Sequence, residues 1–259
     1  MPEGDAVYRT AARLRGALDG RTLTRSDFRV PQHATADLTG RAVLTTLSRG
    51  KHLLTRVEGG LTVHTHLRMD GSWLVTPVGR RTAPGDRVRL ILANAEWQAV
   101  GVRLGMVDLV RTGDEARLVG HLGPDLLGAD WDPDEAVRRL RAAPGRTIGE
   151  ALLDQRNLAG IGTIFRAETL FLRGVWPWKK VGEIEDLDGL VALAQRLLDA
   201  NKGHAGTVTT GDRRPANATW VYGRAGRPCR RCGTRISRGE MGMRPQERLI
   251  LWCAGCQPR

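Results

Sequence analysis

The sequence of 259 residues lacks the features that direct a chain to or through a membrane. It has no apolar run of about 18 residues, the length that a membrane-spanning helix needs. Its start, "MPEGDAVYRT", is acidic and has no apolar core of the kind that a secretory signal carries. We therefore expect a chain that stays in the cytoplasm.

Lysine is scarce, although the chain is basic. Lys51, Lys179, Lys180 and Lys202 are the only lysines among the 40 Lys and Arg residues. The formal net charge is +12 and the pI is near 10.8. Such a charge favours a polyanion as partner, with nucleic acid first and an anionic membrane surface second. The alternative is a solvated basic surface in a chain biased toward arginine.

Cysteine is absent before position 229. The motifs "CRRC" (Cys229, Cys232) and "CAGC" (Cys253, Cys256) are separated by 20 residues. Two C-x2-C turns at this spacing predict a four-cysteine zinc ribbon, in which one zinc ion has no open position and is structural. The alternative is unbound or redox cysteines. Arg248 begins the apolar strand "RLILW" and is expected close to the metal, either as a phosphate contact or as one surface arginine among many.

The hydrophobic pattern divides the chain into segments. Residues 5–18 repeat apolar side chains as a helix does, with Asp5 as the N-cap and Gly20 at the end. Residues 21–112 contain seven short alternating runs with turns such as "MDGS" and "APGD", which predict a β-sandwich or barrel. Helical patterns follow at 132–143, 147–155, 162–174 and 185–201, and residues 203–224 are predicted to form a loop.

The segment "LLDQRNLAGIGTIFRAETLF" predicts two helices around a glycine turn. Gly160 and Gly162 allow a tight turn and a close approach of the backbone. We expect the N–H groups that begin the second helix to face outward, where they suit a phosphate. The alternative is a plain helical hairpin.

The first residues also allow chemistry. Removal of the initiator methionine would leave Pro2 with a free secondary amine, which is partly neutral near pH 7. Such an amine can attack a sugar C1′ and form an iminium, and Glu3 beside it can transfer protons. The alternative is that both residues only precede a helix.

These motifs occur together and in order with "SRGKHLL" (48–54) and "HLRMDGS" (66–72). The chain thereby resembles the Fpg/Nei family of bifunctional DNA glycosylase/AP lyases over nearly its whole length. The "PEGD" opening and "GVRLG" (101–105) are more similar to the endonuclease VIII branch. The resemblance implies a multidomain α+β fold: an N-terminal helix plus β-sandwich (1–116), a linker (117–131), a helix–two-turn–helix domain (132–222) and a zinc ribbon (223–259).

The resemblance also implies roles for single residues. Pro2 is expected to form the Schiff base, and Glu3 to protonate the deoxyribose ring oxygen. Lys51 and Arg248 are expected to bind the phosphate backbone next to the lesion. The implied partner is double-stranded DNA with an oxidised base or an abasic site, bound between the domains by a monomer in the bacterial cytoplasm and nucleoid.

Other residues are expected to contact the distorted DNA. Met69 fills the space left by the extruded base and Arg68 faces the orphaned partner base, since the target base must leave the stack. Gly162 and Thr163 contact phosphate, and Glu168 lies beneath the N-terminus.

Three positions depart from the family pattern. Thr163 replaces the usual asparagine, Ala6 replaces the second glutamate of the enteric proteins, and Leu104 or Arg103 matches the second void-filling loop only loosely. The expected reaction is removal of oxidised pyrimidines followed by β/δ-elimination. The alternatives are a preference for oxidised purines and a lesion-binding protein without catalysis.

Overall fold

The computed structural model describes residues 2–80 and 85–259. Met1 and part of the predicted "APGD" turn lie outside the described residues. The chain forms two compact units: Pro2 with residues 6–121, and residues 3–5 with 122–259. Within the described ranges, no helix combines the length and the apolar character that crossing a bilayer requires.

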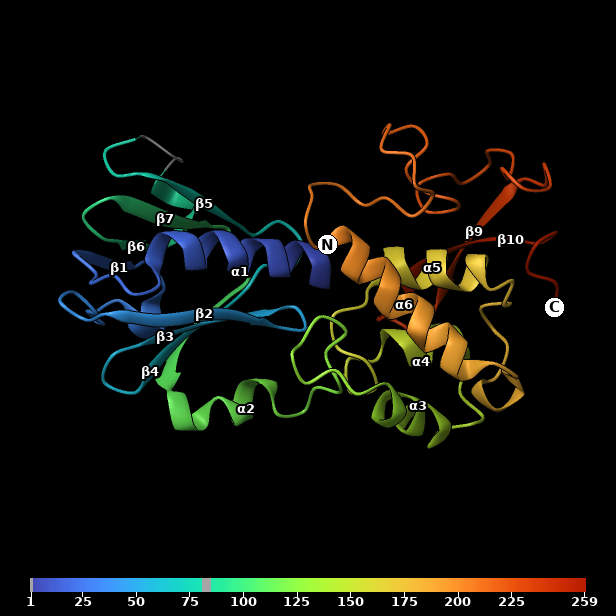
Figure 1. The fold of residues 1–259 in the computed structure, drawn as a ribbon, viewed down its shortest axis with the longest axis horizontal. Helices are drawn as coiled ribbons and strands as arrows, with labels where there is room; N and C mark the ends of the chain where they lie inside the picture. Colours follow the sequence, from blue (N-terminus) through green and yellow to red (C-terminus); the bar gives the residue numbers. More distant parts are fainter. Residues whose placement is uncertain (1, 81–84) are drawn as a thin grey trace. The chain divides into compact units, whose positions relative to one another are not determined.

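The first unit is a sandwich of two antiparallel four-stranded sheets (Figure 1). One sheet has the order β1-β6-β7-β5 and the other β2-β3-β4-β8. The strands are β1 (Arg25–Phe28), β2 (Val43–Arg49), β3 (His52–Val57), β4 (Leu61–His66), β5 (Ser72–Pro77), β6 (Val88–Ala93), β7 (Trp97–Val102) and β8 (Met106–Arg111). The short helix α2 (Ala116–Val119) follows β8.

Helix α1 (Gly4–Leu18) packs onto this sandwich through the predicted stripe. Val7, Ala11, Leu14 and Leu18 are at most 1% exposed and belong to one core with residues of both sheets. An amphipathic helix is stabilised in this way by burial of its apolar face. The predicted N-cap is wrong: the helix already begins at Gly4, so Asp5 lies inside its first turn and is buried.

The second unit contains four helices and a β-hairpin: α3 (Pro133–Arg141), α4 (Ile148–Leu153), α5 (Thr163–Leu172), α6 (Leu187–Asn201), β9 (Ile236–Met241) and β10 (Arg248–Cys253). Asp132 caps α3 by accepting a hydrogen bond from the Glu135 N–H at 3.0 Å. The helices share one apolar core, and a second core joins α5 to the hairpin. Residues 203–224 contain no helix or strand, as predicted.

Candidate active site

Glu3 is buried at the start of α5. Its carboxylate accepts hydrogen bonds from the backbone N–H groups of Gly162 (2.9 Å), Ile164 (2.7 Å) and Phe165 (3.3 Å). The first N–H groups of a helix have no partner within the helix, and this positive end stabilises negative charge. Glu3 therefore caps a helix that lies 159 residues further along the chain.

The glycines of the "LAGIG" turn make this contact possible. The N–H of Gly4 donates to the carbonyl oxygen of Gly160 at 2.8 Å, and Gly160 has a φ of +100°. A Cβ on Gly162 would lie 2.4 Å from Cδ of Glu3. The predicted close approach is confirmed, and the group that approaches the turn is the Glu3 carboxylate.

The prediction for the N–H groups of this helix is wrong in part. Those of Gly162, Ile164 and Phe165 do not face outward toward a phosphate, because they bind Glu3. The predicted phosphate ligand Thr163 is half-buried, and its hydroxyl lies 3.5 Å from that of Tyr222.

Pro2 lies directly before Glu3 and is half-buried. Because α1 begins at Gly4, the positive end of a second helix is close to the proline nitrogen. Once Met1 is removed and this nitrogen is an amine, the positive potential disfavours its ammonium form and favours the neutral, nucleophilic one. Sequence proximity alone also brings the Glu3 carboxylate next to this nitrogen. The pair can attack an electrophilic carbon and move a proton.

Glu168 was expected among the residues that contact DNA, and its burial contradicts that expectation. It is fully buried in α5, and its carboxylate accepts hydrogen bonds from the N–H groups of Trp220, Val221 and Tyr222 at 2.8–2.9 Å. The hydroxyl of Thr209 also donates to it. A buried carboxylate with four donors cannot contact DNA directly, so Glu168 acts by shaping the loop between α6 and the hairpin.

Asn201, which the sequence did not single out, organises the same loop. Its side chain is fully buried at the end of α6, donates to the carbonyl oxygen of Val208 and accepts from the Val208 N–H. A pocket of about 430 Å³ opens in this loop, lined by residues 204–208 together with Arg213, Pro215, Ala218 and Thr219. The signal that could have found Asn201 is a buried polar residue at the end of an amphipathic helix.

Lys51, Arg68 and Met69 all belong to the first unit. Lys51 is in the two-residue turn between β2 and β3, and it is only 8% exposed. Arg68 and Met69 lie in the turn after β4, where Arg68 has a φ of +53° and Met69 is 65% exposed. An exposed apolar side chain on such a turn fits the predicted wedge.

Leu104 does not fit the second void-filling position. It is 6% exposed in the core of the sandwich, beneath Gly101, where a Cβ would meet its Cδ1 at 2.4 Å. Its neighbour Arg103 is exposed and has a φ of +49°. The N–H of Gly105 donates to the carbonyl oxygen of His66, so the loop of Arg103 lies beside the turn that carries Arg68.

The four cysteines come together at the base of the β9–β10 hairpin. Three sulfur pairs are separated by 3.4–3.9 Å. A tetrahedral thiolate site with bonds of about 2.3 Å requires sulfurs about 3.8 Å apart, so this group could hold a metal ion. Hydrogen bonds from Thr234 lower the pKa of Cys232 to about 6, whereas burial raises the pKa of Cys256.

Arg248 is not close to this cluster. It begins β10, whereas Cys253 ends the same six-residue strand, so about 16 Å of extended chain separates them. Arg248 is exposed at the hairpin tip, and its guanidinium donates to the carbonyl oxygens of Gln246 and Glu247.

The hairpin is attached to α5 by a buried arginine. Arg166 donates to the carbonyl oxygens of Gly149 and Leu249, and burial lowers its pKa to about 10, against the opposing charge of Glu3 and Glu150. The sequence did not single out Arg166.

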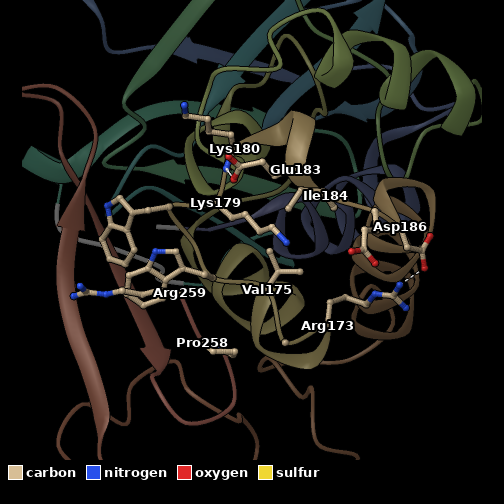
Figure 2. A pocket seen from close by; sticks show the side chains of 13 residues that line it. Arg173, Val175, Lys179, Lys180, Glu183, Ile184, Asp186, Pro258 and Arg259 are labelled. Atoms are coloured by element: carbon tan, nitrogen blue, oxygen red, sulfur yellow. Dashed lines mark hydrogen bonds and ion pairs between the residues drawn. The ribbon is translucent and has the colours of Figure 1, made fainter.

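A larger pocket of about 660 Å³ lies in the second unit and contains none of the predicted site residues (Figure 2). Arg173 and Asp186 form an ion pair at its edge. Lys179, Glu183 and Arg259 add charges of both signs. The mixture of charges beside a tryptophan cluster gives this pocket no clear preference for an anion.

Comparisons with known proteins agree with the motifs. Residues 1–114 match the model of the formamidopyrimidine-DNA glycosylase N-terminal domain. The chain is 56% identical to a probable endonuclease 8 2 of Streptomyces coelicolor, covering 99% of this chain and 94% of that one. It is 45% identical to the DNA-(apurinic or apyrimidinic site) lyase Nei2 of Mycolicibacterium smegmatis, covering 99% of both.

A solved structure shows the same fold. This is a Lactococcus lactis Fpg in complex with DNA that contains an abasic site, with a TM-score of 0.83 and 23% identity. The match covers 99% of this chain and 100% of that one. At this identity the likeness concerns the fold alone.

Proposed function

The chain belongs to the Fpg/Nei family of bifunctional DNA glycosylase/AP lyases, and we propose that it removes oxidised pyrimidines from double-stranded DNA through a Schiff base on Pro2. The observation that carries this proposal is the buried Glu3 carboxylate, held by the start of α5 directly next to Pro2. A lesion-binding protein without catalysis has no need of this pair.

The neutral Pro2 amine attacks C1′ of the damaged nucleotide, and the glycosidic bond breaks with its electron pair going to the base, which takes up a proton from water. The new N–C1′ bond leaves a proton on the nitrogen, which Glu3 accepts and then transfers to the ring oxygen as the sugar opens. The resulting iminium acidifies C2′, so loss of a C2′ proton expels the 3′ phosphate. A second elimination expels the 5′ phosphate.

Five further residues are proposed to contact the DNA. Lys51 and Arg248 bind backbone phosphates, which positions the duplex without reading its sequence. Met69 enters the stack in place of the extruded base, and Arg68 faces the orphaned partner. Thr163 contributes a phosphate contact weaker than that of an asparagine. The loop held by Glu168 offers its pocket of about 430 Å³ to the extruded base.

The ion held by Cys229, Cys232, Cys253 and Cys256 is proposed to be a single zinc, because four thiolates in a tetrahedron suit it and leave no position for substrate. Its role is structural. The protein is proposed to act as a monomer in the cytoplasm, on the DNA of the bacterial nucleoid.

Borohydride trapping on abasic-site DNA tests the reaction. We expect a covalent adduct from protein whose mass confirms Pro2 as its first residue. If such protein forms no adduct, the proposal that it is an enzyme acting through Pro2 is contradicted. A duplex panel that compares thymine glycol and dihydrouracil with 8-oxoguanine tests the substrate, and a strong preference for 8-oxoguanine favours the oxidised-purine alternative.

Replacing Glu3 by Gln separates the two steps. Without a carboxylate to accept the proton of the Pro2 nitrogen as it attacks the closed sugar, and then to carry it to the ring oxygen, we expect base removal to be lost, by about 100-fold or more. Lyase activity on a preformed abasic site, whose sugar opens without the enzyme, is largely retained. Equal loss of both activities would contradict the role given to Glu3.

A further inference from the structure

Three of the six histidines, His52, His64 and His66, lie on the outer face of the β2-β3-β4-β8 sheet. In the strand register His52 of β3 pairs with His66 of β4, and His64 pairs with Asp108 of β8. Side chains alternate between faces along a strand, so these four residues share one face. It is the face opposite Leu53 and Val63, which lie in the core.

A hydrogen-bonded chain joins three of these groups. His64 is fully buried, and its Nδ1 lies 2.8 Å from Oδ2 of Asp108. Nδ1 of His52 lies 2.8 Å from Nε2 of His64. Because a carboxylate only accepts, Nδ1 of His64 carries the hydrogen. In a neutral His64 ring Nε2 then accepts from the Nδ1–H of His52, so Asp108 sets the tautomer of both rings.

The hydrogen-bonded groups lie next to the two turns that carry the proposed DNA contacts. His52 directly follows Lys51. The His52 ring packs edge-on against that of His66, with centroids 4.9 Å apart. Nδ1 of His66 accepts the backbone N–H of Arg68 at 2.9 Å, within the left-handed turn before Met69. Neutral rings are required here, since a protonated His66 could not accept this hydrogen bond.

A metal site explains the cluster less well. Among the described residues, the cysteines are the only group of three or more His, Cys, Asp or Glu side chains whose ligand atoms lie close enough to hold an ion. Nδ1 of both His64 and His66 is also already engaged in a hydrogen bond.

We propose that Asp108, His64 and His52 are positioning residues, which hold the Lys51 turn and the Arg68–Met69 turn in the geometry that the DNA backbone requires. This inference rests on the proposed function. The Asp108 carboxylate fixes the tautomers of His64 and His52. The paired rings then fix the positions of the ends of β3 and β4, and these ends determine the geometry of the two turns. None of the three belongs to the pair, Pro2 and Glu3, that is proposed to carry the reaction.

The tautomers of the three histidine rings in the unaltered protein test this hydrogen-bonded network. Long-range ¹H–¹⁵N spectra at neutral pH should show hydrogen on Nδ1 of His52 and His64, and on Nε2 of His66. Any other tautomer of these rings, or a His64 ring protonated on both nitrogens, overturns the proposal. This measurement needs no variant.

The effect of the hydrogen-bonded groups on DNA binding is tested with the variant Asp108→Val, and Glu115→Gln is the control. Glu115 accepts from Arg56 and Thr62 on the same face, so its loss disturbs the same sheet without touching the histidines. Binding to a duplex with a tetrahydrofuran abasic-site analogue should weaken about fivefold in Asp108→Val, as for one lost hydrogen bond. It should change less than about twofold in Glu115→Gln.

The proposal is overturned if Asp108→Val binds the duplex as tightly as the unaltered protein does. It is also overturned if Asp108→Val and Glu115→Gln lose the same affinity. If Asp108→Val does not fold, the tautomers of the unaltered protein decide. Failure of the unaltered protein to be trapped on abasic-site DNA concerns the proposed function instead, so the two failures are distinguishable.

Discussion

At the scale of single residues, Gly162 makes the sharpest demand on the sequence. A Cβ there would lie within 2.7 Å of three atoms of the Glu3 side chain. We therefore expect Gly162→Ala to displace the carboxylate and to reduce base removal by about tenfold or more. Gly16→Ala is the matched control, because a Cβ at this helical position meets nothing within 4 Å and alanine favours a helix. Similar activity of the two variants in a glycosylase assay would contradict the close approach.

The role of a residue could be predicted from the sequence where its motif has one chemical explanation. It could be predicted less well where the role depends on which segments pack nearby. The paired C-x2-C motifs correctly brought four sulfurs together. Glu168 and Leu104 were expected at the DNA surface, but burial depends on segments far away in the sequence, such as the loop that covers Glu168. Arg248 was expected near the metal because its strand leads into Cys253. The structure shows that Arg248 lies at the opposite end of this strand from Cys253.

At the scale of elements, the ends of β3 and β4 should make stability sensitive to acid. Burial, with neighbouring charges second, lowers the pKa of His52 to about 3 and that of His66 to about 4, from an ordinary value of 6.5. Below pH 6.5 the unfolded chain binds protons that the folded chain does not bind. The free energy of unfolding therefore falls as the pH decreases from 6.5 toward 4, by at most about 1.4 kcal/mol per pH unit for each ring, before solvent screening.

Urea unfolding near pH 7 and near pH 5 measures this loss. The double variant His52→Gln/His66→Gln serves as the comparison, because it removes both rings while carboxylates titrate mainly below this window. We expect its loss of stability between the two pH values to be clearly smaller. An unchanged loss would show that other groups are responsible.

The strands themselves were predictable, since all seven alternating runs became β2 to β8. What "LTVHTHL" could not reveal is that its histidines face Asp108 and His52. Such pairs depend on the register between strands, which the pattern of one strand does not contain. The sequence also missed β1, whose four residues are too short and polar to alternate clearly.

The β9–β10 hairpin gives a prediction about its metal. Trp252 packs edge-on against Trp176 and Trp178, with centroids 5.5 and 4.8 Å apart, and Gln257 donates to the carbonyl oxygen of Val175. Chelation should release the cysteine turns and loosen these contacts, because bound metal supplies much of the folding energy of so small a module. Tryptophan fluorescence should change on chelation and recover with added zinc. The spectrum of Cys256→Ser should already resemble the chelated state.

At the scale of the whole molecule, the net charge of +12 should dominate the affinity for DNA. Each phosphate contact releases counterions, so the logarithm of the binding constant falls linearly with that of the salt concentration. If Lys51 contacts one phosphate, Lys51→Ala reduces the steepness of that dependence by about one unit and weakens binding to all sequences alike. Lys180→Ala removes the same charge from the wall of the pocket in Figure 2 and should leave the slope nearly unchanged. Because both variants have the same net charge, an equal change in slope would mean that the duplex responds to total charge and not to a contact at Lys51.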